Sequence, residues 1–84
     1  PSPPRNLRVT DITPTSITVS WTPPEGNGPI TGYRIQYRWP VNDNEWNEFN
    51  VPRTTNSYTI TNLRPGTEYE FRVQAVNGDG GPWS

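Results

Sequence analysis

Apolar and polar residues alternate along most of this 84-residue chain. A period of two is the spacing of a β-strand that turns one face toward a core. Six stretches keep it, and their apolar members are Leu7 and Val9, followed three residues later by Ile12; Ile17, Val19 and Trp21; Tyr33, Ile35 and Tyr37; Phe49 and Val51; Tyr58 and Ile60; and Tyr69, Phe71, Val73 and Ala75. No segment sustains the three-and-four apolar spacing of an α-helix. The pattern predicts an all-β antiparallel sandwich, with the chain ending where a seventh strand would begin.

The chain opens with Pro1-Ser2-Pro3-Pro4, which cannot start a ladder because proline lacks the backbone donor. We interpret residues 1–4 as a linker and residues 5–84 as one domain. Together with Arg5, the same prolines also resemble a polyproline-II ligand of an SH3-like groove, which is the alternative interpretation.

Composition favours a folded domain over a disordered one, although only 29% of residues are hydrophobic. The formal net charge is -1, and four Trp, four Tyr and two Phe can each bury a large area. The balanced charge gives no electrostatic reason to expect nucleic acid or a membrane surface as a partner. No apolar run is long enough to span a bilayer.

The residue inventory argues against catalysis. The chain contains no His, no Cys and no Lys, which excludes catalytic triads, thiol nucleophiles, Schiff bases and His-ligated metals. Glu68 and Glu70 share one strand face, but a solvated face does not raise the pKa of one carboxyl as acid catalysis requires. The oxygen-rich segments 42–45 and 77–80 leave calcium as a minor alternative, because neither follows the twelve-residue calcium loop. We expect no enzyme, no cofactor and no metal.

Four segments together resemble the fibronectin type III family over nearly the whole chain. They are Ile17–Pro24 (ITVSWTPP), similar to its B strand; Ile30–Arg38 (ITGYRIQYR), similar to its C strand; Leu63–Val73 (LRPGTEYEFRV), similar to its E–F corner and F strand; and Ala75–Gly78, which leads into its F–G loop. The resemblance implies sheets A-B-E and C-C′-F, with strand G absent or truncated. It also implies structural roles for Trp21 in the core and for Leu63 and Tyr69 in a tyrosine corner, where the phenol hydroxyl bonds to the backbone upstream. We expect the partner of that hydroxyl to be a buried backbone carbonyl.

The two outer faces of this sandwich differ in chemistry. Thr10, Thr18, Ser20, Thr59 and Thr61 lie outside sheet A-B-E, whereas Arg34, Gln36, Arg38, Glu48, Glu70, Arg72 and Gln74 lie outside sheet C-C′-F. Arg and Trp are enriched in interface hot spots. The candidate protein-binding residues are therefore Arg34, Arg38 and Arg72, with Trp39 and Trp46 at the margin of that face.

A second candidate binding element is the loop Asn77-Gly78-Asp79. It stands where some members of the family carry Arg-Gly-Asp and bind integrins. Without the arginine, the cation that would reach an acidic pocket is missing, which argues against integrin binding.

The resemblance implies a non-catalytic spacer and protein-binding module, one repeat of an extracellular matrix, adhesion or receptor protein. The alternatives are a mechanical repeat of a giant intracellular muscle protein, a linker domain of a secreted hydrolase, a cytokine-receptor-like domain suggested by Trp83-Ser84, and an engineered scaffold. We expect a protein partner, no contact of this domain with a membrane, and self-association through the exposed edge of strand F.

Overall fold

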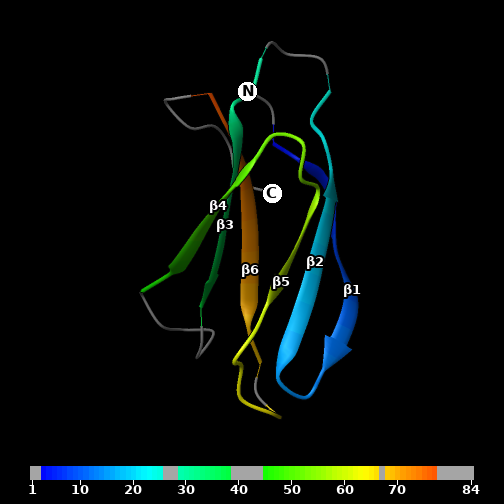
Figure 1. The fold of residues 1–84 in the computed structure, drawn as a ribbon, viewed down its shortest axis with the longest axis vertical. Coiled ribbons are helices and arrows are strands. Elements are labelled where there is room, and N and C mark those ends of the chain that lie inside the picture. The colour runs from blue at the N-terminus through cyan, green and yellow to red at the C-terminus, as the bar shows by residue number, and fades with distance from the viewer. Residues whose placement is uncertain (1–2, 26–28, 39–44, 67, 78–84) are drawn as a thin grey trace.

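Two three-stranded antiparallel sheets pack face to face in the computed structural model, which describes residues 3–25, 29–38, 45–66 and 68–77 (Figure 1). The strands are β1 (Arg5–Thr13), β2 (Ser16–Thr22), β3 (Gly32–Arg38), β4 (Asn47–Pro52), β5 (Ser57–Ile60) and β6 (Glu70–Val76). One sheet has the order β1-β2-β5 and the other β4-β3-β6. The predicted sandwich and its division into sheets A-B-E and C-C′-F are confirmed. Among the described residues, no helix is long and apolar enough to cross a bilayer.

The core lies between the central strands of the two sheets. It consists of Val19 and Trp21 from β2, Tyr33 and Ile35 from β3, and Val73 and Ala75 from β6, each at most 2% exposed. The Trp21 and Tyr33 rings meet edge to face, with centroids 5.3 Å apart. Toward the β5–β6 connection the core continues as half-buried aromatic rings: Tyr37, Phe49, Tyr58, Tyr69 and Phe71.

The inward placement of Val9 was wrong. Val9 is 46% exposed and Ile12 is 69% exposed. The β1–β2 register shifts twice, between Arg5 and Arg8 and between Val9 and Asp11, and Asn6 has a left-handed φ of 54°. Each shift changes which side chains face the core, so strict alternation fails along β1.

The N-terminal boundary differs in detail from the linker interpretation. β1 begins at Arg5, but Pro4 is already buried. The Arg5 guanidinium donates to the Pro23 carbonyl and pairs with Glu25 at 3.2 Å, which ties the start of β1 to the end of β2.

Several expectations fall outside the described residues. Residues 78–84 are among the undescribed ones, so the state of strand G and the outer edge of β6 are not tested, and self-association through that edge stays a prediction. Trp39, Gly78 and Asp79 lie outside the described residues as well.

Candidate protein-interaction surface

The outer face of the β4-β3-β6 sheet gathers charged and amide side chains into one block. β3 is the central strand, so its non-core positions Arg34, Gln36 and Arg38 each have a neighbour on β6. The cross-strand partners on β6 are Gln74, Arg72 and Glu70, in that order, and Glu48 of β4 lies opposite Gln36. We call this set the charged face: Arg34, Gln36, Arg38, Trp46, Glu48, Glu70, Arg72 and Gln74.

Gln36 joins all three strands of the charged face. Its Nε2 donates to Glu48 Oε1 at 2.8 Å, and its Oε1 accepts from Arg72 Nε at 2.8 Å. A single amide therefore links a carboxylate on β4 to a guanidinium on β6. This arrangement requires a residue with both a donor and an acceptor at the centre of the face.

Ion pairs and hydrogen bonds flank Gln36 on both sides. Arg38 donates to the Glu70 carboxylate, and the two form a salt bridge. At the other end, Arg34 Nη1 donates to Gln74 Oε1 at 3.0 Å, and Arg34 Nε lies 3.6 Å from Glu48 Oε2. Gln74 is only 8% exposed although it belongs to the outer face, because neighbouring side chains cover it.

Trp46 directly precedes β4 and lies beside Arg38, the last residue of β3, at the end of the charged face. The Cζ atom of Arg72 lies 4.0 Å from the centroid of the Trp46 ring, and the Cζ atom of Arg38 lies 4.4 Å from it. Cation–π contacts at exposed sites are worth about 0.5–1 kcal/mol each. The ring thus orders two guanidinium groups from neighbouring strands.

The charged face contributes little to stability but is well ordered for binding. The side chains of Arg38 and Glu70 are 23% and 42% exposed, so water screens their attraction and the pair is worth only tenths of a kcal/mol. Long side chains normally lose about 0.5–1.5 kcal/mol of rotamer freedom each when a partner immobilises them. Here the intramolecular contacts have already restricted them, which lowers that cost.

The structure brings four of the predicted binding residues together. Arg34, Arg38, Arg72 and Trp46 share the charged face. Asn77, another predicted binding residue, is exposed. It follows Val76 at the C-terminal end of β6, whereas Glu70 lies at the N-terminal end of that strand.

The sequence analysis missed Gln36 as the organising residue and did not anticipate that Trp46 stacks with two arginines. The signal for Trp46 was present, because the alternation of β4 extends backward from Glu48 by two residues. For Gln36, the sequence offered one indication: the residue lies in the middle of the predicted central strand, where it has a neighbouring strand on each side.

The outer face of the β1-β2-β5 sheet has different chemistry. Thr18 and Thr59 hydroxyls hydrogen-bond at 2.8 Å, and Thr10 and Ser20 hydroxyls at 3.1 Å. These four residues form what we call the hydroxyl face. Its hydroxyl groups bond to one another across strands, and Arg8 and Asp11 of β1, which lie opposite Ser20 and Thr18, are the charged residues beside them.

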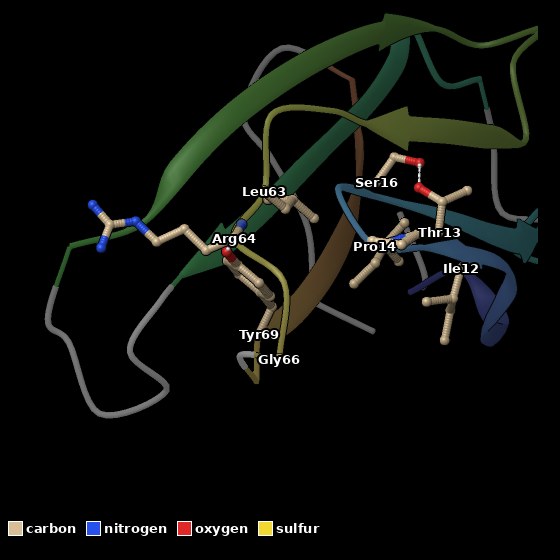
Figure 2. Close-up of a pocket in the computed structure, with 9 residues that line it drawn as sticks. Ile12, Thr13, Pro14, Ser16, Leu63, Arg64, Gly66 and Tyr69 are labelled. Atoms are coloured by element: carbon tan, nitrogen blue, oxygen red, sulfur yellow. Dashed lines mark hydrogen bonds between the residues drawn. The ribbon is translucent and has the colours of Figure 1, made fainter.

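A groove of about 360 Å³ opens between the β1–β2 turn and the β5–β6 connection (Figure 2). Its lining is Ile12, Thr13, Pro14, Ser16, Ile17, Leu63, Arg64, Gly66 and Tyr69. The only titratable side chains among these are Arg64 and Tyr69, so the groove offers no paired acid and base. Among the described residues, no three His, Cys, Asp or Glu side chains cluster to hold a metal.

The hydroxyl of Tyr69 bonds to the backbone upstream, but with a different partner from the one expected. The Arg64 N–H donates to the Tyr69 hydroxyl at 2.8 Å, whereas we expected the hydroxyl to satisfy a buried carbonyl. Leu63 is buried beside it, and its own N–H donates to the Thr15 carbonyl at 2.8 Å. The corner therefore ties the β5–β6 connection to the β1–β2 turn.

Because the donor is the N–H of an exposed residue, Tyr69→Phe should lower the free energy of unfolding by about 1 kcal/mol, as water replaces part of the lost bond. Urea melts of the two proteins measure this. Tyr58→Phe is the matched control, since the described residues provide no hydrogen bond to its hydroxyl. Equal losses in both variants would contradict a role for the corner bond.

Two tyrosines make stability sensitive to alkaline pH. Burial raises the pKa of Tyr33 above 10.0, against a smaller opposing effect of Trp21. Burial, followed by the charges of Tyr69 and Tyr58, raises the pKa of Tyr37. A raised folded pKa means that this stability is fully present below pH 10 and is lost as pH rises through the folded pKa. Because the chain has no Lys, no lysine ammonium group loses its proton in this range.

We therefore expect the free energy of unfolding to be flat between about pH 8 and 9.5 and to fall above about pH 10. Denaturant melts across this range test the expectation, and Tyr33→Phe should reduce the slope. A free energy that stays level or rises up to pH 11 would contradict the burial of these phenols.

The geometry agrees with the family comparison. The family model described as "Fibronectin type III domain" matches residues 2–84. The chain belongs to the fibronectin type III family. Receptor-type tyrosine-protein phosphatase F of Danio rerio is 46% identical over 95% of this chain, and neogenin of Homo sapiens is 46% identical over 95%. The chain spans 4% and 5% of these two relatives.

Solved fibronectin type III structures share the fold. The FN1–FN3 domains of chicken CNTN1 give a TM-score of 0.85 at 30% identity, covering 98% of this chain and 28% of that chain. A computationally redesigned β-sandwich protein gives a TM-score of 0.84 at 35% identity, covering 98% and 86%. Fibronectin type III domains are generally non-catalytic modules.

Proposed function

We propose that this fibronectin type III domain is a spacer and protein-interaction module that binds its protein partner through the charged face. The observation that carries the proposal is the stacking of Arg38 and Arg72 on Trp46. Arg and Trp are the side chains most enriched in binding hot spots. Here they are held in place by Gln36 and Glu70 before any partner arrives.

The proposed setting is an extracellular matrix, adhesion or receptor protein. Relatives named neogenin, tenascin-R and contactin-3 support it. A relative named titin, from Drosophila melanogaster, is 42% identical over 92% of this chain and supports the mechanical alternative in a muscle protein. In either setting the domain separates its neighbours and presents one face for contact.

The test is site-specific photo-cross-linking. A photoreactive residue replaces Asn50, which is exposed opposite Arg34 on the same outer face and makes none of the bonds that order the charged face, or Thr18 at the centre of the hydroxyl face as the matched control. Each protein is exposed to a panel of purified ectodomains and muscle proteins. We expect capture of a defined partner from the Asn50 position, whereas capture from the Thr18 position alone would contradict the proposal.

A further inference from the structure

β4 is a regular outer strand in the described part of the chain, as is β6, but residues 78–84, which follow β6, are not among the described ones. β4 pairs with β3 over six consecutive residue pairs without a register shift, and no described strand pairs along its other edge. By contrast, β1 is interrupted by two register shifts, and β5 has only four residues. Bulges and shortness are two of the devices that blunt strand edges against pairing, and charged side chains and proline are others. β4 has neither a bulge nor a short length, and its Glu48 and its terminal Pro52 restrict pairing to particular registers.

The surroundings of Gly32 show which backbone N–H and C=O groups of β4 point toward β3 and which point away from it. A Cβ built on Gly32 would lie 2.4 Å from the Val51 carbonyl oxygen, so that carbonyl points toward β3. Successive residues of an antiparallel strand direct their backbone groups alternately to either side. Glu48 and Asn50 therefore direct their N–H and C=O groups away from β3. No described residue bonds to these four groups, whereas the Pro52 carbonyl accepts from the Thr55 N–H at 3.0 Å.

We propose that two copies of this domain associate by antiparallel pairing of their β4 strands, with Glu48 of each copy opposite Asn50 of the other. This register joins the copies by four backbone hydrogen bonds, two for each Glu48–Asn50 pair. A register centred on Glu48 would place like charges opposite each other. One centred on Asn50 would use Pro52, which has no N–H and whose carbonyl is already bonded.

The side chains fit the same register. Phe49 of one copy lies opposite Phe49 of the other as a non-hydrogen-bonded pair, the arrangement in which side chains approach most closely. Phe49 already packs on Tyr58 with ring centroids 4.9 Å apart, so the new contact extends the aromatic end of the core. On the outer face, the Glu48 carboxylate lies beside the Asn50 amide, which can donate to it. The two charged faces then form one continuous surface.

Sedimentation over a wide concentration range is the first test. An interface of two edge strands is small, so we expect weak, reversible dimerisation visible only at high concentration, up to about 1 mM. Asn50→Pro removes an outward N–H without touching the β3 ladder, the position at which edge strands tolerate proline. It should weaken dimerisation at least tenfold, whereas the control Asn50→Ala, which keeps the N–H, should retain it. A monomer at every concentration, or equal association of the two variants, would overturn the proposal.

Cross-linking tests the register and does not depend on the proline variant folding. The chain has no native cysteine, so engineered thiols have no background. Opposite residues in a hydrogen-bonded pair have Cα atoms about 5.5 Å apart, within disulfide range. An equimolar mixture of Glu48→Cys and Asn50→Cys proteins should form disulfide dimers faster than either protein alone. Faster cross-linking of either protein alone would overturn the register. Equal cross-linking in the mixture and in the two single proteins, as expected for pairing through the β6 edge, would overturn the β4 interface.

Discussion

Replacing Gly32 with alanine is expected to lower the free energy of unfolding by about 2–3 kcal/mol, the upper part of the range of about 1–3 kcal/mol for overpacking. Gly32 is buried in the central strand, paired with Pro52 on one side and Val76 on the other. A Cβ there would meet the Val51 carbonyl oxygen at 2.4 Å, and that oxygen belongs to the ladder itself. Relief requires β4 to move away from β3, which disturbs the backbone under the charged face.

Gly66→Ala provides the matched control. Gly66 has a φ of +73° but open space where a Cβ would lie, so its substitution costs only the backbone strain, about 1 kcal/mol. For a domain of this size, 1 kcal/mol corresponds to roughly 4–8 °C in Tm, so thermal melts separate the two variants clearly. A smaller loss for Gly32→Ala than for Gly66→Ala would contradict the close approach of β4 to β3.

Truncating Trp46 to alanine should weaken partner binding by about 30-fold, equivalent to about 2 kcal/mol, the threshold of a hot spot. The substitution removes the ring itself and also frees the guanidinium groups of Arg38 and Arg72 that stack on it. A partner must then order those side chains again. The free energy of unfolding should change by no more than about 1–2 kcal/mol, because Trp46 is only half-buried.

A conservative substitution separates ring stacking from simple bulk. Trp46→Phe keeps an aromatic face with a weaker attraction for cations, so affinity should fall between those of the native protein and Trp46→Ala. Binding to the partner found by cross-linking is measured by calorimetry for all three proteins. Native affinity in Trp46→Ala would show that the ring plays no part in recognition.

The fold could be predicted from the sequence where the strands are regular. β2, β3 and β6 keep strict alternation, and Val19, Ile35 and Val73 are buried as the period of two requires. β1 departed from expectation because register shifts depend on how a strand pairs with its neighbour, which the residues of a single strand do not determine. The same holds for Gly32: a side chain there would collide with the Val51 carbonyl of β4, and the sequence of β3 does not reveal that contact.

The site was predicted only in part for a related reason. Alternation placed Arg34, Arg38 and Arg72 on one face, but contacts between side chains depend on cross-strand register. Gln36 bridges Glu48 and Arg72 because β4 and β6 place those residues directly opposite it. The Tyr69 hydroxyl was likewise given a carbonyl partner, since the sequence cannot distinguish a nearby C=O from the Arg64 N–H.

The central claim is that the charged face, and not the hydroxyl face, carries binding. The most direct measurement compares the Kd of the cross-linked partner for Arg72→Glu and Thr59→Glu, which introduce the same residue on opposite faces. We expect Arg72→Glu to raise Kd at least about tenfold, mainly through slower association at low salt. Thr59→Glu should change Kd by less than about twofold, since surface charges at a distance are screened. An equal or larger effect of Thr59→Glu would contradict the account.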